Sequence, residues 1–131
     1  MRVFITLLLL LIANVIFTPP SISANNLLPG EEDYFPIADP MPEPVEGMPG
    51  LIKKIQYPAA AKKTGIEGRV IAMAYINENG GVDDVKIIRG LGGGCDEEVQ
   101  RVVKESKFKP GYQAGKPVKT KLTLSFTFKL T

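Results

Sequence analysis

Residues 65–90, GIEGRVIAMAYINENGGVDDVKIIRG, decide the fold. Two runs rich in β-branched and other apolar side chains, 69–76 and 82–89, are separated by the short segment NENGG. Two such runs joined by a short turn of Asn and Gly indicate a β-hairpin. Both faces of the first run are apolar, because every residue after Arg69 is Val, Ile, Ala, Met or Tyr. This pattern predicts a central strand that is covered over part of each side.

The end of the chain predicts a second region of sheet. From Val118 to Leu130, apolar side chains and polar or basic ones alternate almost without interruption. Successive side chains of a strand point to opposite faces, so this pattern indicates a strand with one buried face and one solvated face. The prediction is a strand of thirteen residues, which is long for a small domain.

Between these regions, the stretch GLGGGCDEEVQRVVKESKF predicts a glycine-rich connection followed by a helix. Cys95 or Asp96 is expected at the helix cap, and Glu97 and Glu98 are expected in the first turn, where acidic side chains interact favourably with the positive end of the helix dipole. Val99, Val102 and Val103 form a narrow apolar stripe at helical spacing. The same acidic residues argue against phosphate binding at GLGGG, and the following KPGYQAGKP is expected to be a loop.

Upstream of the hairpin, GMPGLIKKIQYP predicts a short helix around Leu51, Ile52 and Ile55. Pro58 is expected at the first position of a second short helix, AAAKKTG, because the N–H that proline lacks is not needed there. Gly65 is expected to end that helix. The order of elements is therefore helix, strand, strand, helix, strand, which is an α+β chain.

The N-terminus has the composition of an export signal. Residues 1–24 carry Arg2, an apolar run of about 15 residues, two prolines and then small residues, so cleavage after Ser23 or Ala24 is expected. The alternative is a retained membrane anchor, although roughly 20 apolar residues are needed to span a bilayer. Residues 25–46 are acidic and rich in proline, which predicts a semi-stiff tether before a domain at 47–131.

Composition limits the chemistry that this chain can perform. The sequence contains no histidine, and Cys95 is its one cysteine, so neither an internal disulfide nor a cysteine–histidine pair can form. Cys95 is interpreted as a small residue near a helix start, with an intermolecular disulfide as the alternative. Asp83 and Asp84 are neighbours in a predicted strand and are expected to face opposite ways. We therefore expect no catalytic residues, no metal site, no cofactor and no enzymatic activity.

Charge is distributed unevenly along the chain. Residues 25–46 contain six acidic residues and no basic one, whereas residues 47–131 carry fifteen Lys and Arg against eight Asp and Glu. A basic domain can bind nucleic acid. However, the lysines are spread over all elements, and there is neither a nucleic-acid motif nor a stripe of aromatic residues. No nucleic-acid partner is expected.

Several short motifs occur in an order that resembles a known family. They are Tyr57-Pro58, GIEGRV at 65–70, the turn into Val82, Phe108 to Gly111, and GKPV at 115–118. Together they are similar to the C-terminal domain of TonB-family energy transducers, over roughly residues 47–131. The resemblance implies an α+β module in which a three-stranded antiparallel sheet packs against two or so helices, in the order α-β-β-α-β.

The resemblance also implies a partner and a site. In the family, the last strand is an open edge that receives the TonB box of an outer-membrane receptor by strand addition, and the ExbB and ExbD motor then transmits proton-motive force to the transporter. The implied partner-binding residues are Lys54, Gln56, Lys121, Leu122, Thr123, Leu124, Ser125, Phe126, Thr127 and Phe128. Tyr57 is expected to pack in the fold, and Gly68, Gly80 and Gly111 are expected to be structural. A homodimer through open strands is a further possibility.

Two features depart from the family. The predicted tether reaches about 70 Å when fully extended, which is short for a periplasm, and the apolar N-terminal run lacks the histidine of well-known family anchors. Two interpretations follow: a short transducer held in the inner membrane by a single segment and facing the periplasm, or a cleaved, free periplasmic module that binds peptides without energy coupling. A third, from another class, is an exported protease inhibitor that presents the turn at 77–81.

Overall fold

The computed structural model describes residues 33–131, so the predicted signal or anchor at 1–24 and the first part of the predicted tether lie outside the described residues. Within residues 33–131, every helix is too short or too polar to cross a membrane. The elements in chain order are β1 (Glu43–Pro44), α1 (Gly47–Lys53), α2 (Ala59–Lys63), β2 (Gly68–Ile76), β3 (Val82–Arg89), α3 (Cys95–Glu105), β4 (Phe108–Lys109), β5 (Gly111–Gln113), β6 (Lys116–Val118) and β7 (Thr120–Phe128).

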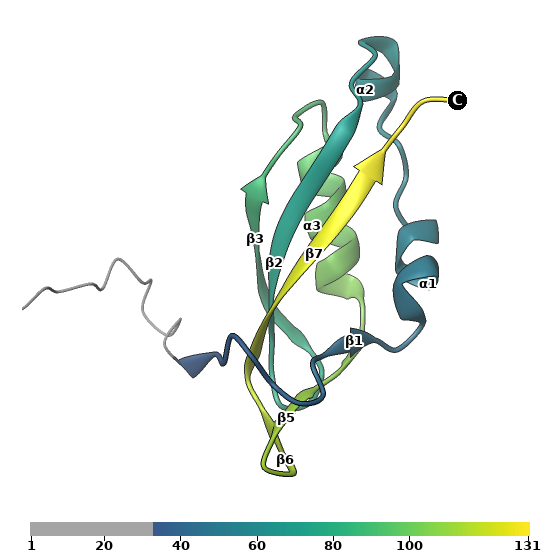
Figure 1. The fold of residues 1–131 in the computed structure, drawn as a ribbon. Coiled ribbons are helices and arrows are strands. Elements are labelled where there is room, and N and C mark those ends of the chain that lie inside the picture. The colour runs from purple at the N-terminus through teal and green to yellow at the C-terminus, as the bar shows by residue number, and fades with distance from the viewer. Residues whose placement is uncertain (1–32) are drawn as a thin grey trace, which may run out of the picture.

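The main sheet has three antiparallel strands in the order β3-β2-β7, and α3 lies across one of its faces (Figure 1). This confirms the α+β class, and β2 is the central strand as predicted. The core lies between α3 and the sheet. It contains Val70, Ala72, Ala74 and Ile76 from β2, Val99, Val102 and Val103 from α3, and Leu124, Phe126 and Phe128 from β7.

The β2–β3 hairpin forms as predicted, and its turn is built by one asparagine. The side-chain oxygen Oδ1 of Asn77 accepts hydrogen bonds from the backbone N–H groups of Asn79 and Gly81, each at 3.0 Å. Gly80 has a φ of +83°, and a Cβ on it would lie 1.9 Å from the carbonyl oxygen of Phe108. The Gly80 carbonyl in turn accepts a hydrogen bond from the Phe108 N–H at 2.9 Å. The turn therefore packs against β4 and requires glycine.

The long C-terminal strand was predicted with the wrong boundaries. β7 begins at Thr120, and Val118 belongs to β6, where it pairs with Gly111 of β5. The segment predicted as a loop instead forms β4 and the small β5–β6 hairpin. Ala114 and Gly115 both have positive φ, at 49° and 78°, which is typical of a two-residue hairpin turn. At the other end, the Leu130 N–H leaves the ladder and donates to Glu67 at 2.8 Å.

The start of α3 also differs from the prediction. The N-cap residue is Gly94, with a φ of +90°, and Cys95 is the first, fully buried residue of the helix. The Asp96 carboxylate does not cap the helix. It accepts hydrogen bonds from the backbone N–H groups of Leu91, at 2.8 Å, and Gly92, at 3.3 Å. Asp96 therefore ties the glycine-rich connection to the helix that follows it.

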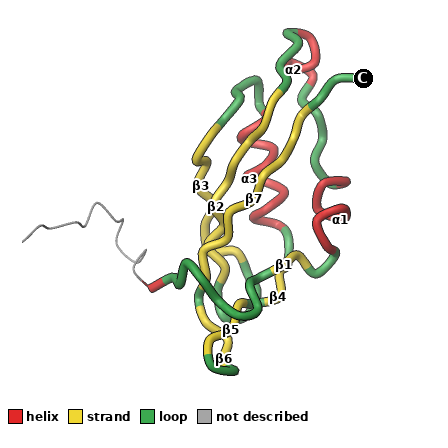
Figure 2. Tube along the Cα trace, in the orientation of Figure 1, coloured by secondary structure: helices red, strands yellow, loops and turns green. Residues whose placement is uncertain are grey.

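Residues 33–46, which we call the leader, run along the domain (Figure 2). β1 pairs with β4, and the Asp39 N–H donates to the Tyr112 carbonyl at 2.8 Å. Ala38 is buried, whereas Ile37 is 74% exposed. The described part of the predicted tether is thus held against the domain by backbone hydrogen bonds.

Candidate functional site: the outer edge of β7

The outer edge of β7 carries unpaired backbone groups. β7 pairs with β2 in an unbroken register from Gly68↔Phe128 to Ile76↔Thr120. The Phe35 N–H donates to the Lys119 carbonyl at 2.8 Å on the side away from β2, and the Lys121 N–H donates to the Phe35 carbonyl at 2.9 Å. Since backbone groups alternate in direction along a strand, the odd-numbered residues of β7 direct their N–H and C=O groups outward.

Three residues therefore make up the open edge: Thr123, Ser125 and Thr127. All three side chains are exposed. In the part of the chain that the structure describes, no strand pairs with β7 on this side beyond the single bridge between Phe35 and Thr120. An edge of this kind is a template for another extended chain.

The opposite edge of the sheet is less suitable for pairing. The ladder between β2 and β3 shifts register twice, between Ile71 and Ala72 and between Tyr75 and Ile76. Bulges of this kind twist a strand and interrupt its row of hydrogen-bonding groups. β3 also carries the charged residues Asp83, Asp84, Lys86 and Arg89. Of the two edges, only that of β7 is regular.

A partly apolar groove runs beside the open edge. It has a volume of about 260 Å³ and lies between the end of α1 with the segment that follows it and the second half of β7. Ile52, at 51% exposure, and Ile55 form one wall, while Ser125, Phe126, Thr127, Phe128 and Lys129 form the other. Tyr57 also lines the groove, and its ring stands edge-on to that of Phe128. A strand added to β7 would place alternate side chains in this groove.

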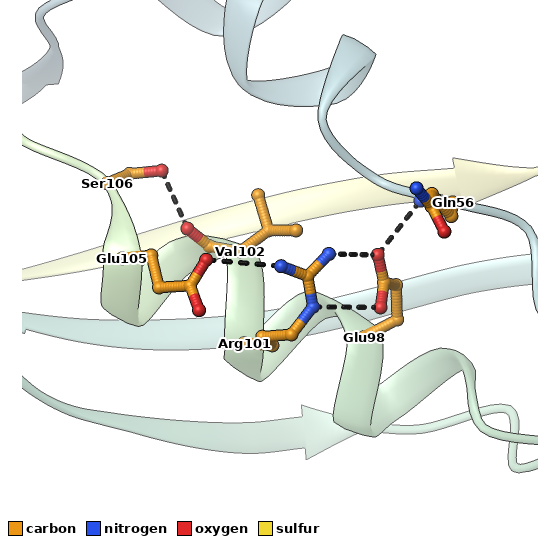
Figure 3. A network of polar contacts seen from close by, with 6 residues as sticks. All are labelled: Gln56, Glu98, Arg101, Val102, Glu105 and Ser106. Atoms are coloured by element: carbon orange, nitrogen blue, oxygen red, sulfur yellow. Dashed lines mark hydrogen bonds and ion pairs between the residues drawn. The ribbon is translucent and has the colours of Figure 1, made fainter.

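A polar network holds the wall formed by the segment after α1 (Figure 3). The Glu98 carboxylate accepts a hydrogen bond from the Gln56 backbone N–H at 3.0 Å and two from the Arg101 guanidinium, at 2.7 and 3.2 Å. Arg101 also contacts Glu105 at 3.1 Å. The hydrogen bonds from Arg101, and secondarily that from Gln56, lower the pKa of Glu98 against the opposing effect of burial. Glu98 is therefore a charged link between α3 and the segment that leads into Tyr57.

The structure divides the residues implied by the family resemblance into three groups. Thr123, Ser125 and Thr127 lie on the open edge. Lys121 lies at its start, with its N–H already bonded to Phe35. Leu122, Leu124, Phe126 and Phe128 direct their backbone groups toward β2, and the last three have buried side chains.

The two residues before Tyr57 lie differently. Gln56 stands between the groove-lining residues Ile55 and Tyr57 and is fixed by Glu98. Lys54 forms an ion pair with Glu46 at 2.7 Å and lines neighbouring cavities rather than the groove. Sequence reasoning assigned Ile52 and Ile55 to a helix and not to the site. The spacing of apolar residues does not distinguish a helix that covers the core from one that faces a groove.

Metal-ligating and thiol groups are the next features of the described residues. Within residues 33–131, no cluster of three His, Cys, Asp or Glu side chains could hold a metal ion. Cys95 is fully buried, and burial, followed by the nearby Asp96 and Glu97, raises the pKa of its thiol. A buried, protonated thiol is a poor nucleophile. The arrangement of the site favours binding of an extended chain.

Known proteins resemble the domain that contains this edge. Residues 53–130 match the model of a family described as the Gram-negative bacterial TonB protein C-terminal. The chain is 33% identical over 75 residues to protein TonB of Pseudomonas aeruginosa, a match that covers 56% of this chain and 22% of that protein. The chain thus corresponds to about a fifth of the length of this relative.

A solved structure shares the fold. The solution structure of the P. aeruginosa TonB C-terminal domain superposes with a TM-score of 0.52 at 29% identity, over 68% of this chain and 86% of that one. The solution structure of a Helicobacter pylori TonB C-terminal domain gives a TM-score of 0.47 at 21% identity, over 60% and 84% of the two chains.

Proposed function

Because the chain belongs to the family of Gram-negative bacterial TonB C-terminal domains, we propose that it binds the TonB box of an outer-membrane receptor by strand addition to β7. In this role it helps to transmit energy from the proton-motive force to transport across the outer membrane. Its partner is an extended protein segment, and its activity is binding rather than catalysis.

The observation that carries this proposal is the open edge from Thr123 to Thr127. Main-chain hydrogen bonds to an added strand supply affinity that depends little on the sequence of the guest, and pockets for alternate side chains supply specificity. Here the groove formed by Ile52, Ile55 and Tyr57 lies next to that edge. Apolar guest side chains on this side would lose water-exposed surface, which favours binding.

The geometry also suits the transmission of force. β7 is hydrogen-bonded to the central strand β2 along its whole length. A guest pulled parallel to β7 loads its hydrogen bonds in shear, so that they share the load, and β7 passes the load on to β2. The domain can therefore carry tension between the leader and the guest.

The location and the energy source depend on the N-terminal segment. If residues 1–24 remain in the inner membrane, the protein is a short transducer that can engage ExbB and ExbD. If they are cleaved, the domain is a free periplasmic adaptor without energy coupling. N-terminal sequencing of the protein from separated membrane and periplasmic fractions distinguishes the two: a mature chain that starts near Ala24 or Asn25 contradicts the anchored form.

Two other uses of the domain receive less support. A homodimer through β7 would occupy the same edge, and Lys121 and Lys129 at the two ends of that edge would repel their counterparts in a second copy. A protease inhibitor would need an accessible loop, but the turn at 77–81 is bonded through Gly80 to Phe108.

The direct test is a titration of the isotopically labelled protein with a synthetic TonB-box peptide, followed by backbone NMR. The expected result is a localised response of Thr123, Ser125, Thr127 and the residues that line the groove. A response confined to α2 or β3 would contradict the proposal.

A further inference from the structure

The open edge of β7 is already partly occupied, and the occupant is the chain's own leader. Phe35 makes two backbone hydrogen bonds at the start of β7: its N–H donates to the Lys119 carbonyl at 2.8 Å, and its carbonyl accepts from the Lys121 N–H at 2.9 Å. This is the geometry of a one-residue parallel bridge opposite Thr120. Phe35 thus uses the same kind of backbone group that a guest strand would use, at the start of the same strand.

The residue before the bridge is fastened to the sheet. The Tyr34 hydroxyl donates a hydrogen bond to the Asp83 carboxylate, which also accepts one from the Asn77 side chain at 2.9 Å. The Tyr34 ring stands edge-on to that of Tyr75, with centroids 5.1 Å apart, and the Lys119 ammonium group lies 5.5 Å from the centre of the Tyr34 ring. These contacts come from β2, β3 and the residue before β7, so Tyr34 clamps the leader at this end of the sheet.

The leader does not continue along the edge beyond Phe35. Pro36 follows, Ile37 is largely exposed, and the next backbone bonds of the leader go to Tyr112 of β5. The leader therefore does not pair with the Lys121 carbonyl or with the backbone groups of Thr123. The edge is divided into a part held by the leader, at 119–121, and an open part, at 123–127.

From this division we infer that Phe35 competes with the guest strand for the start of β7, so that guest length and leader release are coupled. The inference rests on the proposed function. A short guest fits on the open part and leaves Phe35 in place. A longer guest that extends toward Lys119 must displace Phe35 and loosen Tyr34. Coupling of this kind is reciprocal: a released leader favours the longer guest, and the longer guest favours a released leader.

This coupling would make the leader a sensor of tension. The leader joins the N-terminal segment to β7 directly through the bridge at Phe35. Tension applied from the N-terminal side would act on Tyr34 and Phe35 before it reached β1. Their release would expose the edge at 119–121 and allow additional hydrogen bonds to the guest.

The test uses the full chain, two variants and three synthetic peptides. The first peptide is a seven-residue TonB box; the other two add four residues, alternately Thr and Val, at its N-terminus or at its C-terminus. Tyr34→Ala removes the clamp, and Ile37→Ala is the matched control, because Ile37 lies in the same leader but is largely exposed. Calorimetry gives the affinities, and hydrogen exchange reports on the Phe35 and Lys121 amides.

The expected result is that one extended peptide, the one that runs toward Lys119, binds Tyr34→Ala about fivefold more tightly than it binds the unmodified protein, since a larger fraction of the variant is competent to bind. The seven-residue peptide should bind both proteins equally, and Ile37→Ala should behave as the unmodified protein. Saturation with that extended peptide should speed the exchange of the Phe35 amide.

The failures of the two proposals can be told apart. If the peptides protect the Thr123, Ser125 and Thr127 amides but Tyr34→Ala changes no affinity and the Phe35 amide stays protected, the inference is wrong and strand addition stands. If none of the peptides binds to β7, the proposed function is wrong and the inference falls with it.

Discussion

The Tyr57 ring stands edge-on to the Phe128 ring, with centroids 5.4 Å apart and planes at 87°. Tyr57 precedes α2, and Phe128 is the last residue of β7, so this pair joins the segment after α1 to the end of the edge strand. The Tyr57 hydroxyl also donates a hydrogen bond to the Ile66 carbonyl, and the Lys62 ammonium group lies 5.9 Å from the ring centre. The pair thus fixes one end of the groove.

Removal of the Tyr57 ring should affect both stability and binding. Tyr57→Ala is expected to lower the free energy of unfolding by about 2 kcal/mol, less than for a fully buried ring, and to weaken peptide binding because the ring forms part of the groove. Tyr57→Phe keeps the ring and loses only the hydrogen bond to Ile66. It should cost about 1 kcal/mol and leave peptide affinity unchanged. Urea unfolding measures the stability of each protein, and calorimetry measures its affinity for the peptide. Equal peptide affinity for all three proteins would mean that the Tyr57 ring does not contribute to peptide binding.

A proline placed in β7 should report which way each N–H points. Thr127→Pro removes an outward N–H, so the sheet should still form, as proline is tolerated on edge strands, while peptide affinity should fall about tenfold. Thr127→Ala retains the N–H and is the control, with affinity expected to be near that of the unmodified protein. Phe126→Pro removes an inward N–H and should unfold the domain. Circular dichroism and calorimetry separate these outcomes; an unfolded Thr127→Pro variant would show that the register is wrong.

Glycine at position 80 should be essential for stability. The Cβ of Gly80→Ala would lie 1.9 Å from the Phe108 carbonyl oxygen, in a backbone conformation with a φ of +83°. The expected cost is about 3 kcal/mol or more. Gly115→Ala is the matched control, since Gly115 has a similar φ of +78° but no atom within 4 Å of its Cβ position. That variant should lose only about 1 kcal/mol from backbone strain. Equal losses in urea unfolding would mean that the hairpin turn does not pack against β4.

The link through Glu98 should depend on pH. The folded state lowers the pKa of this carboxyl, chiefly through Arg101, below an unfolded value of about 4.3. Its contribution to stability is therefore complete above that unfolded value and is lost as the pH falls through the lower, folded value. About half of the Arg101 side chain is exposed, so screening by solvent keeps the contribution of the ion pair to stability small. The difference in unfolding free energy between the unmodified protein and Glu98→Gln should be larger at pH 7 than at pH 3. A difference that is the same at both values would contradict a charged role.

The sequence predicted the elements whose pattern is periodic. The bounds of β3 and the apolar stripe of α3 were predicted correctly, and β2 starts one residue earlier than expected, because alternation and helical spacing depend directly on which side chains are buried. The break at Lys119 was missed, since Val118 continues the alternation of β7 although its backbone pairs with Gly111. Alternation of apolar and polar residues indicates which face of a sheet each side chain points to, but not which strand its backbone pairs with.

The candidate site was predictable only in part. The outward direction of Thr123, Ser125 and Thr127 follows from the register with β2, which no local pattern reveals. The bridge at Phe35 could not be anticipated either, because a single pair of hydrogen bonds leaves no periodic trace in the sequence. The sequence did contain the motifs of the TonB family, and the resemblance to this family indicated that the last strand is an edge strand.

Amide hydrogen exchange with and without a TonB-box peptide shows whether β7 presents a row of unpaired backbone groups to a guest. In the free protein, we expect fast exchange at Thr123, Ser125 and Thr127 and slow exchange at Leu122, Leu124 and Phe126, whose backbone groups point toward β2. The peptide should slow the first three amides and leave the second three unchanged. If the outward amides are already protected in the free protein, or still exchange fast at saturating peptide, β7 is not the edge that binds the guest.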